Sequence, residues 1–224
     1  MSYFFINYRK GVSVIKFSNK SYLRNIVQTM FLIIFLILIG GGRTQLWIII
    51  FGIGLLISLI WGRFYCGWIC PINTVIKIKN WFYEKLGIDT KQTPSIFKKS
   101  RIRWILLILM IGSMIITRRM NLQLNVLLYI LGIAFLISLF YKEELWHKYL
   151  CPYGALLSLA NKANSKKLVI DKNLCRSCGL CAESCPNDII SITKEKQTIG
   201  SSECLYCFRC QDICEFKAIS FKES

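Results

Sequence analysis

The chain has 224 residues, 54% of them hydrophobic, and its 29 Lys and Arg against 12 Asp and Glu give a formal net charge of +17. The basic residues gather at the ends of long apolar segments, which is typical of a membrane protein and argues against a nucleic-acid partner. Eleven cysteines are also typical of a secreted disulfide scaffold, but such scaffolds are short and lack the triplet spacing found here. They indicate bound metal in a reducing compartment.

A basic arm, residues 1–24, opens the chain with five Lys and Arg and no acidic residue. It leads into an uncharged apolar run over residues 26–42, which predicts a first transmembrane helix. A cleaved signal peptide is the alternative, but the charged part is long and no small-x-small cleavage site follows. We therefore expect an uncleaved anchor.

Three further apolar runs, residues 46–61, 104–117 and 120–141, predict three more transmembrane helices. The run over 104–117 is short, because a bilayer core needs about 20 residues. The flanking Arg103 and Arg118 can snorkel and extend it at both ends. The expected membrane domain is an all-α four-helix bundle.

The basic residues also predict the orientation of the spans. Lys and Arg number five in the arm, nine in residues 62–103 and five in residues 142–167, against one and two in the short turns. By the positive-inside rule, the chain is a multi-pass protein of the cell membrane with cytoplasmic N- and C-termini. Every cysteine then lies on the cytoplasmic side or at its membrane edge.

Residues 71–83, which follow the second predicted span, mix apolar, aromatic and lysine residues. They form either an amphipathic helix on the membrane surface or a connecting helix packed on the bundle. The sequence leaves both interpretations open. Residues 91–100, which include Pro94, predict a solvated linker.

Two further motifs follow the second and fourth predicted spans. Aligning Cys70-Pro71 with Cys151-Pro152 makes the chain an 81-residue repeat of hairpin plus motif. The spacing of i and i+4 would place both side chains of each motif on one helical face, if the segments are helical. The candidate further metal or cluster site consists of Cys66, Cys70, His147 and Cys151. In the alternative, the cysteines are small buried residues and His147 is an interfacial side chain.

Eight of the eleven cysteines form one duplicated unit near the C-terminus. The order Cys175-x2-Cys178-x2-Cys181-x3-Cys185-Pro186 returns 29 residues later as Cys204-x2-Cys207-x2-Cys210-x3-Cys214. In this spacing three cysteines hold one [4Fe-4S] cluster and the fourth holds the other. A zinc pair would need only Cys-x2-Cys couples, so the third cysteine of each triplet would be superfluous. The spacing assigns cluster I to Cys175, Cys178, Cys181 and Cys214, and cluster II to Cys204, Cys207, Cys210 and Cys185.

Residues 168–222 resemble a bacterial-type two-cluster ferredoxin domain. The resemblance implies a repeated βαβ shape and the transfer of single electrons. Short β-prone runs at 168–170, 189–192 and 218–221 flank the cysteine loops and agree with that shape. Glu215 stands where many ferredoxins have a proline, which bears on the surroundings of cluster I and not on its ligands.

Nearly the whole chain, residues 20–222, resembles the membrane polyferredoxins found as accessory subunits of periplasmic nitrate reductase, nitrous oxide reductase and cytochrome oxidase assembly. In that family two C-x3-C-P motifs follow the second and fourth spans, with a two-cluster ferredoxin domain behind them. The resemblance implies electron transfer between a cytoplasmic or quinol donor and a membrane or extracytoplasmic redox partner protein. His147 stands where the family has cysteine, and histidine on iron raises the reduction potential.

The expected organisation is a basic arm (1–24), a four-span membrane domain (25–165) with motifs at 66–71 and 147–152, and a C-terminal α+β two-[4Fe-4S] ferredoxin-like domain (166–224). No catalytic residue is indicated, so we expect an electron-carrier subunit of an oxidoreductase system, embedded in lipid, and not a stand-alone enzyme. Two other functions stay open. One is an assembly factor that supplies electrons for metal reduction in a partner oxidoreductase, and the other is a non-redox zinc-binding membrane scaffold.

Overall fold

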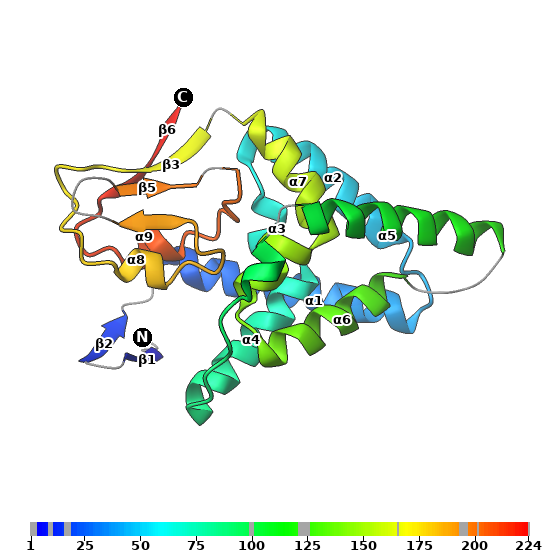
Figure 1. Ribbon diagram of the computed structural model, residues 1–224, viewed down its shortest axis with the longest axis horizontal. Helices are drawn as coiled ribbons and strands as arrows, with labels where there is room; N and C mark the ends of the chain where they lie inside the picture. Colours follow the sequence, from blue (N-terminus) through cyan, green and yellow to red (C-terminus); the bar gives the residue numbers. More distant parts are fainter. Residues whose placement is uncertain are drawn as a thin grey trace.

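A computed structural model describes residues 4–8, 11–15, 19–98, 101–120, 126–164, 166–192, 197–200 and 202–223. The expected basic residues Arg9, Lys10 and Lys16 lie outside this part of the chain. The described part is mostly helical, and a small region of short strands and helices packs at one end of the long helices (Figure 1). That region, at the left of the view, is the C-terminal ferredoxin-like domain.

Four apolar helices lie where the four spans were expected: α1 (Asn19–Gly40), α2 (Leu46–Trp61), α5 (Arg101–Arg119) and α6 (Val126–Phe140). In the described residues, only α1 is long and apolar enough to cross a membrane on its own, and the apolar parts of the other three are shorter. Helix α5 is longer than the apolar run that predicted it, because arginines continue it at both ends. Residues 121–125, from the expected start of the fourth span, lie outside the described residues.

The surfaces of these four helices are unusually apolar. Large hydrophobic side chains point outward along each of them, including Ile37 on α1, Leu56 on α2, Ile108 on α5 and Leu136 on α6, which are 59% to 69% exposed. The inward positions include small residues such as Ser58, which is wholly buried. A soluble monomer rarely exposes so much contiguous apolar surface.

The two motif segments have similar local structure, in which a short helical segment precedes a helix that begins at proline. The first holds α3 (Phe64–Trp68) followed by α4 (Pro71–Leu86), and the second holds the π-helical turn η2 (Leu145–Leu150) followed by α7 (Pro152–Lys162). Helix α4 buries one face against α1 and α6, as a packed connecting helix does, and leaves Ile78, Phe82 and Leu86 exposed on the other. A short 3-10 helix, η1 (Ser95–Lys98), lies in the segment expected to be a linker.

The ferredoxin-like domain has two small antiparallel sheets. Strand β3 (Lys166–Ile170) pairs with β6 (Ile219–Glu223), and β4 (Ile190–Ile192) pairs with β5 (Gln197–Ile199). The short helices α8 (Leu180–Glu183) and α9 (Arg209–Ile213) follow the cysteine loops. Three of these strands lie at the expected runs, whereas β5 and the N-terminal hairpin of β1 (Phe4–Tyr8) and β2 (Gly11–Ile15) were not anticipated.

Candidate functional site

Each predicted cysteine quartet lines one cavity. Cys175, Cys178, Cys181 and Cys214 line a cavity of about 140 Å³, together with Ile213, Phe216 and Ile219. Cys204, Cys207, Cys210 and Cys185 line a second, smaller cavity of about 20 Å³, together with Ile189, Ile190 and Leu205. The two quartets are therefore separated in space in the way the crossed spacing rule expects. Four soft thiol donors in an apolar shell fit an iron-sulfur cluster.

The two cavities differ in their exposure. Cys178 in the first quartet is exposed, whereas Cys204 and Cys210 in the second are buried. Burial raises the pKa of Cys204 to about 12, although the amide of Tyr206 acts against this rise. Burial likewise raises the pKa of Cys185 to about 11. Such thiols bind as thiolates only where a metal offsets the cost of the buried charge.

The loop that carries the second quartet is held by side chains of the helical part. Trp68 Nε1 of α3 donates to the carbonyl oxygen of Tyr206 at 3.0 Å, and Asn161 Nδ2 of α7 donates to that of Ser202 at 3.1 Å. Arg24 of α1 donates to the carbonyl oxygen of Cys207. Three helices thus bind the main chain of one cysteine loop. The sequence placed Arg24 in the basic arm and did not single out Asn161.

The two Cys-Pro cysteines have the same backbone geometry. The amide of Cys70 donates to the carbonyl oxygen of Tyr65 at 3.0 Å, and the amide of Cys151 donates to that of Trp146 at 2.8 Å, five residues back in both cases. Both cysteines are extended, with ψ of 120° and 113°, and each caps a helix whose first residue is proline. A proline disfavours the helical conformation in the residue before it. The helical segment on which the expected shared face of Cys66 and Cys70, and of His147 and Cys151, depended therefore ends at Cys70 and at Cys151.

This geometry gives the Cys-Pro pair a physical role. Cys151 Sγ accepts a hydrogen bond from the amide of Gly154 at 3.3 Å, in the first turn of α7. A cysteine at a helix N-terminus presents its sulfur to free amides and to the positive end of the helix dipole, which favours the thiolate. Burial acts in the opposite direction and raises the pKa of Cys151 to about 11.

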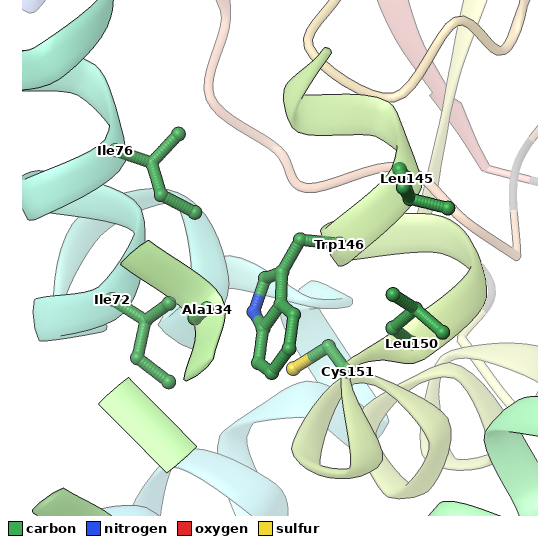
Figure 2. Close-up of a cluster of buried hydrophobic side chains, with 7 residues drawn as sticks. All are labelled: Ile72, Ile76, Ala134, Leu145, Trp146, Leu150 and Cys151. Atoms are coloured by element: carbon green, nitrogen blue, oxygen red, sulfur yellow. The ribbon is translucent and has the colours of Figure 1, made fainter. Parts of the chain in front are cut away.

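The structure brings three of the four motif side chains together. Cys70 packs against the hydrophobic cluster that contains Cys66 and also against the one that contains Cys151. In Figure 2 the indole of Trp146 lies between Ile72 and the sulfur of Cys151. The described residues contain no group of three or more His, Cys, Asp or Glu side chains close enough to hold a single metal ion. A cluster spreads its ligands more widely than one ion does.

His147 is buried at the same place, with its main chain beside the first motif. Its carbonyl oxygen lies 3.4 Å from Arg63 Nη2, which is itself 3.9 Å from Cys66 Sγ. Burial, reinforced by Arg63 and Arg209, lowers the pKa of His147 to about 3, so the imidazole is neutral. Two buried nitrogens here, Arg63 Nε and His147 Nε2, have no hydrogen-bond partner among the described residues.

Arg63, which is wholly buried, and Glu203, which is partly buried, form an ion pair that the sequence did not reveal. Arg63 Nη1 lies 2.7 Å from Glu203 Oε2, and Arg103 Nη1 lies 2.9 Å from the same oxygen. Glu203 directly precedes Cys204 of the second quartet. Its partners are 140 and 100 residues away in the chain, so no local pattern could have identified them.

Comparison with protein families agrees with the repeat and with the ferredoxin-like domain. The family described as 4Fe-4S binding domain matches residues 44–88 and again residues 125–170. The two matches begin at 44 and 125, so their offset of 81 residues is the one that aligns the Cys-Pro pairs. The family described as 4Fe-4S dicluster domain matches residues 167–215. The chain therefore binds [4Fe-4S] clusters.

Several proteins are similar to this chain. An uncharacterized protein of Methanocaldococcus jannaschii, MJ0749, is 29% identical over 94% of this chain and 94% of its own length. The ferredoxin-type protein NapH of Haemophilus influenzae is 28% identical over 73% of this chain and 63% of its own length. The methylamine utilization ferredoxin-type protein MauN of Paracoccus denitrificans is 26% identical over 60% of this chain and 52% of its own length.

No solved structure matches the chain significantly. The family matches cover both halves of the helical repeat and the cysteine-rich domain, and the named relatives NapH and MauN are ferredoxin-type proteins. The chain spans somewhat less than two thirds of NapH and about half of MauN. It belongs to the polyferredoxin-type 4Fe-4S proteins that include NapH and MauN, a family of electron-transfer proteins.

Proposed function

We propose that the chain is an integral membrane protein that relays single electrons between a cytoplasmic or quinol donor and a membrane or extracytoplasmic redox partner. In this proposal α1, α2, α5 and α6 span the membrane and both termini are cytoplasmic. The exposed apolar side chains of these four helices support it, because lipid tails and not water would cover them. The apolar parts of α2, α5 and α6 are short, so they need a locally thinned bilayer or snorkelling flanking residues to span it.

We assign cluster I to Cys175, Cys178, Cys181 and Cys214, and cluster II to Cys204, Cys207, Cys210 and Cys185. The support is that each quartet lines one cavity with an apolar shell. When bound, the clusters supply one-electron redox capacity. The chain's own contribution is to hold the thiolates, exclude water from the buried quartet and fix the distance between the sites.

The observation that carries the proposal is the contact between the cluster II loop and the first motif. Gly67, between Cys66 and Cys70, accepts a hydrogen bond from Gln28 Nε2 at 2.7 Å and packs on the main chain of Leu205 and Cys207. The second quartet thus lies against the helical part, whereas the first quartet, with Cys178 exposed, faces outward. The order that follows is cytoplasmic donor, cluster I, cluster II and then the motif pair.

A third centre at the motif pair completes this relay. Cys66, Cys70 and Cys151 supply three thiols, and His147 supplies a neutral imidazole with an unpartnered Nε2. Histidine replaces cysteine on iron in known clusters. The match of both motif segments to a 4Fe-4S binding domain supports a cluster there and not a single ion.

Iron and acid-labile sulfide analysis of the detergent-purified protein, prepared without oxygen, tests the third centre. Two clusters account for about eight iron per chain, so we expect a clear excess over that value. Replacing Cys70 and Cys151 by Ala should remove the excess and leave the EPR signals of the reduced ferredoxin-like domain. Ser58→Ala, a control at another buried position, should keep it.

Three outcomes separate the alternatives. About eight iron that the double variant does not change would refute the third centre and leave a two-cluster carrier. Zinc without sulfide would refute the redox function and favour a scaffold. Protein that alkaline carbonate releases from membranes, or a fluorescent reporter at the C-terminus that stays dark, would refute the proposed membrane topology.

A further inference from the structure

The guanidinium of Arg63 contacts both motifs and the ferredoxin-like domain. Arg63 is wholly buried, and its Nη2 lies 3.9 Å from Cys66 Sγ and 3.4 Å from the carbonyl oxygen of His147. Gly154, just after the second motif in α7, leaves room for it, because a Cβ at that position would lie 2.6 Å from Arg63 Nη2. Residues from both halves of the repeat therefore contact this charged side chain.

The counter-charge comes from the cluster II loop. Glu203 Oε2 accepts from Arg63 at 2.7 Å and from Arg103 at 2.9 Å, so two positive charges face one negative charge. The Glu203 main chain is fixed as well, since its carbonyl oxygen accepts from Asn187 Nδ2 at 2.7 Å. Burial acts to lower the pKa of Arg63, but the neighbouring Cys66 and Glu203 raise it above its ordinary value, so the charge is permanent.

We propose that Arg63 and Glu203 are positioning residues that set, in opposite directions, the reduction potentials of cluster II and of the motif-pair centre. A fixed positive charge favours the form of a centre that carries one more electron, and a fixed negative charge disfavours it. Arg63 is wholly buried and the side chain of Glu203 is 22% exposed, so solvent screens this pair less than it screens a surface pair. The inference rests on the proposed function. The step itself is the passage of one electron between two centres, with no bond formed or broken.

Redox titration followed by EPR on the intact, cluster-loaded protein tests this inference. Arg63→Gln should lower the reduction potential of the motif-pair centre, which Arg63 adjoins. Glu203→Gln should raise that potential. Arg63→Lys keeps the charge and should stay near the unaltered protein. Arg176→Gln makes the same change at an exposed residue beside the first quartet, and it should leave both potentials unchanged.

A different result is expected if the Arg63–Glu203 pair only holds the ferredoxin-like domain against the helical part. Both variants would then loosen the domain contact and move the potentials in the same direction or not at all, which would overturn the inference. If Arg63→Gln fails to fold, Glu203→Gln and Arg63→Lys decide: a raised potential in the first with an unchanged one in the second supports the inference, and any other pair of results overturns it. If iron analysis finds only two clusters, the opposite shifts are read on cluster II, whose ligand Cys204 adjoins Glu203. The inference then stands or falls separately from the third centre.

Discussion

Gly67 lies so close to the main chain of Leu205 that no side chain fits between them. A Cβ on Gly67 would lie 2.4 Å from the carbonyl oxygen of Leu205 and 3.3 Å from the amide nitrogen of Cys207. At Gly67 the first motif and the cluster II loop therefore touch backbone to backbone, beside the hydrogen bond from Trp68 to Tyr206. No side chain separates the two main chains at this point.

Gly67→Ala should force the loop away from the motif. Because electron tunnelling falls steeply with distance, we expect slower reduction of the motif-pair centre by cluster II, with the iron content retained. Overpacking of this kind also destabilises by about 1–3 kcal/mol. Stopped-flow reduction monitored by EPR after freeze-quenching measures the rate.

Gly52→Ala is the matched control, because a Cβ there meets nothing within 4 Å. It should leave the rate unchanged. An unaltered rate in Gly67→Ala, in protein that keeps its iron, would show that electrons do not pass through this contact.

The sequence predicted the positions of the four apolar helices and of three strands in the ferredoxin-like domain. These features depend on local hydrophobic runs and on fixed cysteine spacing, both of which are readable along the chain. It also predicted the 81-residue repeat, which the family matches confirm. The break at Cys70 and Cys151 was missed, although the following proline is the local signal for it.

The contacts between the helical part and the cysteine loop could not be predicted. Trp68 binds a carbonyl oxygen 138 residues away, and Arg24 binds one 183 residues away. Main-chain acceptors are the same in every residue, so the sequence does not identify which one a side chain will reach. Arg24 was assigned to the cytoplasmic arm, whereas the structure buries it in α1 against Cys207 and Asp212.

Trp68→Phe should weaken the attachment of the ferredoxin-like domain by removing one hydrogen bond. The ring of Trp68 stacks on Phe64 at 4.8 Å between centroids, and phenylalanine retains most of that contact. Loss of the bond from Nε1 to Tyr206 should cost about 1 kcal/mol. Denaturant unfolding in detergent, followed by the visible absorbance of the clusters, measures the loss.

Trp61→Phe provides the comparison, since Trp61 is 56% exposed and a phenylalanine ring still lies under Lys166. That variant should unfold at the same denaturant concentration as the unaltered protein. Equal midpoints for Trp68→Phe and Trp61→Phe would mean that the bond to Tyr206 adds nothing to stability.

Stability should depend on pH through His147. Burial, with Arg63 and Arg209 nearby, lowers the pKa of this imidazole to about 3 in the folded chain, against about 6.5 when unfolded. Below pH 6.5 the unfolded chain binds a proton that the folded chain does not. The contribution is therefore complete above pH 6.5 and declines as the pH falls toward 3, by about 1.4 kcal/mol for each pH unit.

His147→Asn carries no titrating group and should lose this part of the pH dependence. Denaturant unfolding between pH 7.5 and about pH 5.5, a range set to straddle the unfolded imidazole pKa, compares the two proteins under identical conditions, so acid damage to the clusters affects both. The curves should converge as the pH falls. Curves that stay parallel over this range would mean that His147 binds its proton as readily in the folded protein as in the unfolded chain, which contradicts both its burial and its proposed place beside Cys66 and Cys151.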